Sequence, residues 1–214
     1  MNKFLRFISF FFLLLSISFN SLSDNQLDNF NSKFAKYKSD PKVRSAKAMV
    51  VNQNNGKVIY QKNAYSEASI ASLTKLMTAM VILDSKIDLK KEIKITKHDI
   101  DRLKGTGSRI PIGTLVTGYD LLKISLMSSD NRAASALSRA YPSGKKGFIK
   151  AMNIKALKLG MHNSKFADPT GLNKRNKSTA RDLVRMVEAA YQYPEIRKIT
   201  TTSQETFRIG KRKN

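Results

Sequence analysis

The pattern of apolar and polar positions first predicts a β-hairpin. Two short, mainly apolar runs at residues 46–51 and 57–61 flank the dipeptide Asn55-Gly56. Asn-Gly between two such runs is a strong hairpin signal, because both residues readily adopt the positive φ angles of a tight turn. We therefore expect two antiparallel strands here. A two-stranded hairpin is not stable by itself, so either helices cover it or further strands pair with it.

After the hairpin, the apolar positions take the spacing of helices. Helices are expected to begin near Ser72, Thr117, Asn131, Phe148 and Thr179. Thr117 and Asp120 form a capping box, Gly160 supplies a left-handed C-cap, and a proline follows the last helix. A short strand is expected at residues 92–96, and no further element after Pro194. A hairpin followed by helices indicates a mixed α/β (α+β) fold.

Ser72 and Lys75 stand three residues apart in the apolar segment Ile70–Met80. On a helix they share one face, one turn apart, within reach of a hydrogen bond. A serine hydroxyl is a weak nucleophile until a base takes its proton. A lysine amine can be that base when desolvation or nearby positive charge lowers its pKa. The alternative is an ordinary amphipathic helix with a serine N-cap and a solvated lysine, and this spacing alone does not separate the two.

A second motif, Ser129-Asp130-Asn131, lies between two expected helices. A second hydroxyl near Ser72 and Lys75 can relay a proton to a leaving amine, and an asparagine amide can both donate to and accept from a substrate peptide bond. Alone, the triplet could simply cap a helix. The S-x-x-K and S-x-N motifs in this order, each at a helix start, favour catalysis.

The first residues have the pattern of a secretory signal peptide. Lys3 and Arg6 precede an apolar run at residues 7–19, and the small and polar residues Asn20–Ser23 follow. A basic head, a short apolar stretch and small residues near the cut are typical of export signals, so we expect cleavage after Ser23 and a periplasmic protein. The run is short for a membrane span, which disfavours a retained anchor.

The length of 214 residues indicates one domain behind this signal. Residues 24–45 are polar with few apolar anchors and are expected to form a flexible lead-in. The domain itself is expected at residues 46–200, and a basic tail at 201–214.

The formal net charge of +23 at pH 7 calls for a partner or for a large solvated surface. Nucleic acid is not expected, because the chain has an export signal. Anionic phospholipid or an acidic cell-wall polymer remains, and solvated surface lysines are the alternative. With no cysteine and only two histidines, His98 and His162, we expect neither a metal site nor another cofactor.

Four stretches resemble the serine-type D-alanyl-D-alanine peptidases, the low-molecular-mass penicillin-binding proteins, and among these most closely the D-alanyl-D-alanine endopeptidases. They are residues 70–86, 126–142, 148–172 and 178–186. The resemblance implies a penicillin-binding-protein/β-lactamase-like transpeptidase fold. It also implies endopeptidase or carboxypeptidase activity on peptidoglycan peptides through an acyl-enzyme, and β-lactams as covalent inhibitors.

The same resemblance implies roles for the motif residues. Ser72 would be the acyl-enzyme nucleophile and Lys75 its general base. Ser129 would relay the proton, and Asn131 would orient the substrate. The backbone N–H of Ser72 would supply half of the oxyanion hole.

Other assignments of the catalytic groups are less favoured. A Ser-His-Asp triad needs a histidine beside the nucleophile, but His98 lies in a polar stretch and His162 follows the Gly160 cap in an expected loop. Asp168 is the nearest candidate for a deacylating carboxylate. The resemblance gives its segment a structural role instead.

One family motif is not found in this sequence. The family carries Lys-Thr-Gly or Lys-Ser-Gly on a later strand, where the lysine holds the substrate carboxylate and the backbone supplies a second oxyanion donor. Lys104-Gly105-Thr106-Gly107 is a different pattern and precedes Ser129. We therefore expect a truncated member in which the C-terminal strands of the sheet are missing, with an open sheet edge, an exposed apolar face and weak or absent activity.

Two hypotheses follow. The first is an exported serine D,D-peptidase, impaired to the extent that the missing segment matters. The second is a non-catalytic, basic cell-envelope binding protein that retains part of the same fold.

Overall fold

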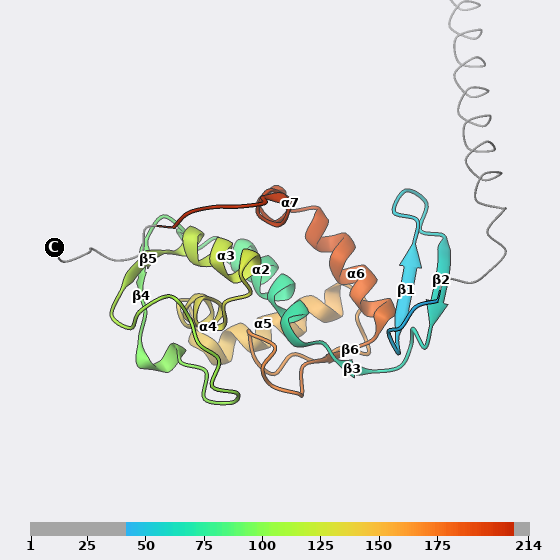
Figure 1. Ribbon diagram of the computed structural model, residues 1–214, viewed down its shortest axis with the longest axis horizontal. Helices are drawn as coiled ribbons and strands as arrows, with labels where there is room; N and C mark the ends of the chain where they lie inside the picture. Colours follow the sequence, from blue (N-terminus) through green and yellow to red (C-terminus); the bar gives the residue numbers. More distant parts are fainter. Residues whose placement is uncertain (1–41, 208–214) are drawn as a thin grey trace, which may run out of the picture. The chain divides into compact units, whose positions relative to one another are not determined.

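In the computed structural model, which describes residues 42–207, the folded chain begins with the expected hairpin (Figure 1). Strand β1 (Ala48–Val51) pairs antiparallel with β2 (Val58–Lys62). Gly56 closes the turn with φ +69° and donates its N–H to the carbonyl of Asn52 over 2.8 Å. The hairpin predicted from Asn55-Gly56 is confirmed. The expected signal peptide, most of the lead-in and residues 208–214 lie outside the described residues.

The central helix of the domain is α2 (Thr74–Asp84). It packs against α3 (Gly118–Met127), α4 (Asn131–Arg139), α5 (Gly144–Lys158) and α6 (Ala180–Tyr191), as Figure 1 shows. The α2 side chains of Met77, Met80 and Ile82 are fully buried. Helix α2 follows directly from the turn that contains Ser72, so the core of the domain fixes the position of that turn.

Helix ends follow the predicted capping residues. The hydroxyls of Thr117 and Thr179 each accept the N–H of the aspartate three residues later, over 3.1 Å. The Asp130 carboxylate caps α4 in the same way over 2.9 Å. Gly160 has φ +70° just after α5. Helix α5 begins at Gly144 rather than near Phe148, because the small residues of its first turn give no apolar periodicity.

The expectation that no element follows Pro194 is wrong. Helix α7 (Pro194–Thr201) starts at this proline and buries Ile196 and Ile199. Proline ends the preceding helix but is well tolerated in the first turn of the next, where its missing N–H would have no helical partner.

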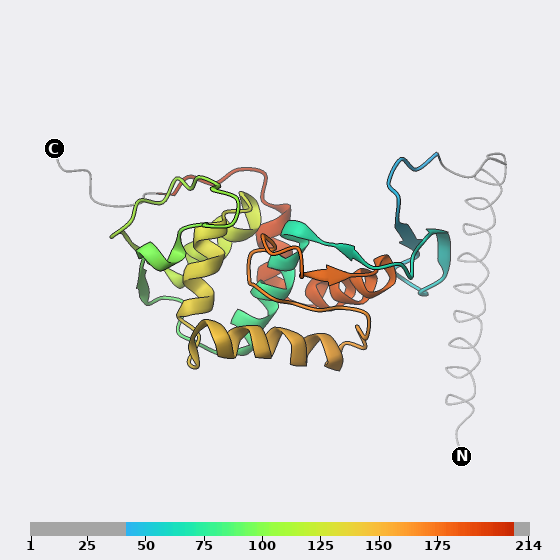
Figure 2. The same ribbon diagram turned by 90° about the horizontal axis from the view of Figure 1, so that it is seen from below.

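Two small antiparallel pairs complete the described residues. Strand β4 (Glu92–Lys94) pairs with β5 (Leu115–Thr117), and β3 (Ala68–Ser69) pairs with β6 (Lys177–Ser178). Figure 2 shows β3 and β6 side by side. The second pair brings the segment before Ser72 next to the segment that ends α6's N-terminal loop. Only β4 was expected, since strands this short carry no periodicity.

An apolar groove of about 570 Å³ lies between β1 and α6. Val50, Val187 and Tyr191 line it and remain about half exposed. Within residues 42–207, β1 pairs with no strand other than β2. This agrees with the expected open edge and exposed apolar face. In the same range, no helix combines the length and the hydrophobicity needed to cross a bilayer.

Candidate active site

Ser72 lies in a single 3₁₀ turn, η1 (Ala71–Leu73), immediately before α2. The turn begins with Ala71 at φ +45°, a left-handed conformation that is unusual for a residue with a side chain. Gly171 packs so closely against it that an added Cβ would stand 1.8 Å from the Ala71 carbonyl oxygen. Two unusual features thus hold the backbone at the nucleophile, as strained residues often do at functional sites.

Lys75 is the buried centre of the site, with 3% of its surface exposed. Its Nζ donates to Ser72 Oγ over 3.1 Å, to Asn131 Oδ1 over 2.7 Å and to the Thr170 carbonyl over 2.9 Å. These three acceptors match the three N–H donors of an ammonium group. The predicted Ser72–Lys75 hydrogen bond is confirmed, and the alternative of a solvated lysine is wrong.

The environment of Lys75 also changes its protonation. Burial lowers its pKa to about 8, against the opposing attraction of the Asp168 and Asp130 carboxylates. A useful fraction of the amine is then neutral near physiological pH. Since Asn131 Oδ1 and the Thr170 carbonyl can only accept, the neutral amine directs two N–H groups at them and its lone pair at Ser72. The hydrogen-bond pattern makes Ser72 the group whose proton Lys75 can take.

The second motif lies on the other side of this centre, at the turn between α3 and α4. Ser129 has φ +55° and an exposed side chain, and it lines a pocket of about 1,240 Å³ together with Ser72 and Asn131. Among the described residues, its hydroxyl hydrogen-bonds neither Ser72 nor Lys75. The structure therefore joins Ser72, Lys75 and Asn131 in one hydrogen-bonded group and places Ser129 on the wall beside it.

Thr106 is a site residue that sequence reasoning missed. Asn131 Nδ2 donates to Thr106 Oγ1 over 2.9 Å, and Thr106 Oγ1 donates to Asp101 Oδ2 over 2.6 Å. Burial acts to raise the pKa of Asp101, but hydrogen bonds from Thr106 and from the neighbouring backbone outweigh it and lower the pKa to about 2. The carboxylate is therefore ionised and can only accept, so Thr106 must donate to it. Thr106 then accepts from Asn131, which turns Asn131 Oδ1 toward Lys75.

We expect Thr106→Val to slow acylation of Ser72 about tenfold, because it leaves the Asn131 amide without its fixed acceptor, a loss of about 1–3 kcal/mol. The measurement is the rate of labelling by a fluorescent penicillin. Thr106→Ser keeps the hydroxyl and serves as the matched control. Equal rates for Thr106→Val and the unchanged chain would show that Thr106 does not position Asn131.

A buried polar network holds the Thr170 carbonyl against Lys75. The Asp168 carboxylate accepts from Thr170 Oγ1 over 2.5 Å, from the Gly171 N–H over 2.9 Å and from Asn176 Nδ2 over 2.8 Å. Asn176 is fully buried and also donates to Thr74 Oγ1 at the start of α2, over 2.9 Å. Because these donors occupy the Asp168 carboxylate, its position fits the structural role better than that of a deacylating base.

Neither histidine contributes to the group around Ser72. His98 lies exposed in η2 (Lys97–Asp99), and His162 follows α5 in a separate pocket. Within residues 42–207, no group of three or more acidic, histidine or cysteine side chains could hold a metal ion. The arrangement supports covalent chemistry at a serine activated by a lysine.

The fold and this site define the class of protein. The crystal structure of the Streptomyces K15 DD-transpeptidase superposes with a TM-score of 0.75 at 31% identity, over 80% of this chain and 70% of that one. The sequence profile of the D-alanyl-D-alanine carboxypeptidase family, Peptidase_S11, matches residues 34–214. The chain belongs to this family of serine D-Ala-D-Ala peptidases, and the predicted penicillin-binding-protein fold is confirmed.

Two curated relatives are D-alanyl-D-alanine endopeptidases. The Pseudomonas aeruginosa protein is 46% identical over 77% of this chain and 53% of its own length. The Escherichia coli protein is 45% identical over 78% of this chain and 54% of its own length. The chain thus spans about half the length of these relatives.

Proposed function

We propose that this chain carries the nucleophile and the base of a serine-type D-alanyl-D-alanine peptidase. It would cleave peptidoglycan peptides, as an endopeptidase or carboxypeptidase, through an acyl-enzyme. The observation that carries the proposal is the buried Lys75, whose lowered pKa and two acceptor-only contacts direct its lone pair at Ser72. The names of the endopeptidase relatives support the substrate class.

In the proposed acylation, Ser72 Oγ attacks the carbonyl carbon of the D-Ala-D-Ala bond while its proton passes to Lys75 Nζ. The backbone N–H of Ser72 stabilises the oxyanion that forms. The C–N bond then breaks, and the leaving amine takes up a proton that Ser129 relays from the pocket wall. Asn131 retains one N–H and one lone pair with which to bind the substrate peptide. Water then hydrolyses the ester with Lys75 again as base.

The proposal extends to the surroundings of the protein. The signal-peptide pattern of residues 1–23 supports export to the periplasm. A net charge of +23 suits an anionic envelope surface better than nucleic acid in that compartment. The proposed chemistry uses no metal or other cofactor, and β-lactams would acylate the same serine. A purely non-catalytic envelope protein would have no need of a buried lysine aimed at a serine.

The test is covalent labelling of the chain from Asp24 onward with a fluorescent penicillin, beside Ser72→Ala. We expect a labelled band that is lost in Ser72→Ala, because only an activated serine opens the β-lactam ring. Circular dichroism of both proteins verifies that the helices are formed. A folded protein that takes up no label, or that labels equally in Ser72→Ala, would contradict the proposal.

A further inference from the structure

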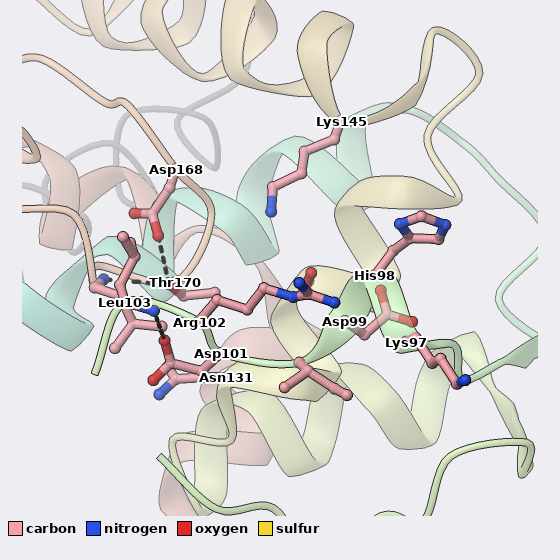
Figure 3. Close-up of a pocket in the computed structure, with 13 residues that line it drawn as sticks. Lys97, His98, Asp99, Asp101, Arg102, Leu103, Asn131, Lys145, Asp168 and Thr170 are labelled. Carbon is pink, nitrogen blue, oxygen red and sulfur yellow. Dashed lines mark hydrogen bonds between the residues drawn. The ribbon is translucent and has the colours of Figure 1, made fainter. Parts of the chain in front are cut away.

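A second pocket, of about 480 Å³, lies beside the Lys75 group (Figure 3). Its wall includes Asn131, Asp168 and Thr170, the residues that hold Lys75 or its carbonyl acceptor. Asn131 also lines the pocket that contains Ser72. A peptide bound with its scissile bond at Ser72 therefore has this second pocket on the far side of one asparagine.

Cationic side chains dominate the free charge of this pocket. Arg102 extends into it from the loop after η2, and Lys145 from the first turn of α5, as Figure 3 shows. Lys97 and His98 line the same pocket. Among the residues that the structure describes, no acidic side chain pairs with Arg102, Lys145 or Lys97.

The three acidic residues of the pocket are already satisfied from within the fold. The fully buried Asp99 carboxylate forms an ion pair with Arg139 over 2.9 Å. Asp101 accepts from Thr106 and from nearby backbone N–H groups, and Asp168 accepts from its own loop and from Asn176. Positive charge thus faces the pocket without a counter-charge.

We propose that this pocket binds a carboxylate of the substrate, so that the peptides which react at Ser72 are anionic stem peptides with a free acid group upstream of the D-Ala-D-Ala end. The proposal rests on the proposed function for its choice of ligand. Arginine presents a planar fork that matches a carboxylate, and lysine adds a point charge. Leu103 and Leu172 line the pocket beside them and offer apolar contact to the stem of an acidic side chain.

The test measures equilibrium binding to Ser72→Ala protein, so that it does not depend on acylation. The probes are fluorescent peptides that end in D-Ala-D-Ala and carry one glutamate one, two or three residues before that end. The same peptides with glutamine are isosteric controls. We expect one glutamate position to bind about tenfold more tightly than its glutamine counterpart, as one or two charge-assisted contacts imply. The preference should weaken in high salt.

The matched variants separate a site from general charge attraction. Arg102→Gln with Lys145→Gln should abolish the preference for glutamate. Lys104→Gln with Lys146→Gln removes the same charge from neighbouring side chains that do not line the pocket, and should keep the preference. Equal affinity for glutamate and glutamine peptides, or an equal loss in both double variants, would overturn the proposal. Failure of penicillin labelling with an intact glutamate preference would overturn the proposed function and leave this inference standing.

Discussion

Replacing Lys75 with methionine is expected to slow acylation of Ser72 by about 10²–10⁴-fold, the usual contribution of a general base. Methionine fills much of the same buried volume but cannot take the serine proton. The unchanged chain should acylate faster as the pH rises through about 8, because the amine loses its proton there and becomes a competent base. Lys75→Met should lose this rise.

The measurement is the rate of fluorescent-penicillin labelling from pH 6 to pH 10. Lys150→Met, which changes an exposed lysine on α5, is the matched control and should follow the unchanged chain. A pH-dependent rise that persists in Lys75→Met would assign the base to another group and remove Lys75 from the mechanism.

Gly171→Ala is expected to destabilise the fold by about 2–4 kcal/mol, from left-handed backbone strain and overpacking together. Gly171 has φ +87°, and its new Cβ would stand 1.8 Å from the carbonyl oxygen of Ala71 and 3.0 Å from the backbone nitrogen of Ser72. The neighbour is backbone and cannot rotate away. Relief of the overlap would displace the turn that holds Ser72, so labelling by penicillin should fall as well.

Thermal unfolding followed by circular dichroism measures this effect. Gly107→Ala is the matched control, because a Cβ there meets nothing within 4 Å and the backbone needs no positive φ. A Gly171→Ala protein as stable as Gly107→Ala would show that the two loops can separate at little cost.

The features that the sequence predicted are local ones. Asn55-Gly56 marks its hairpin, Thr117 and Thr179 mark helix starts, and Ser72 and Lys75 meet because three positions along a helical segment make one turn. In each case, the signal and its structural consequence lie within a few residues. The same holds for Asp130, whose carboxylate caps α4 and thereby fixes Asn131 at the first position of that helix.

The contacts that complete the site are not local, and the sequence alone gave no sign of them. Thr170 is 95 residues from Lys75, and Thr106 is 25 residues from Asn131. Nothing in the pattern around Thr106 distinguishes a turn residue from a positioning residue. The family resemblance brought Ser72, Lys75 and Asn131 together, but it gave the Asp168 segment only a general structural role. Its network with Asn176 emerged from the three-dimensional packing.

The burial of Lys75 also has a thermodynamic consequence for the whole domain. Its pKa is about 8 in the folded state and near 10.5 in an exposed chain, so between these values the unfolded chain binds more protons than the folded one. The free energy of unfolding therefore rises with pH across this window. Below pH 8 the fold contains a desolvated ammonium that disfavours it by roughly 3 kcal/mol, at about 1.4 kcal/mol for each pH unit. The group that activates the serine is thus one that weakens the native state at neutral pH, and its removal should leave a more stable but inert domain.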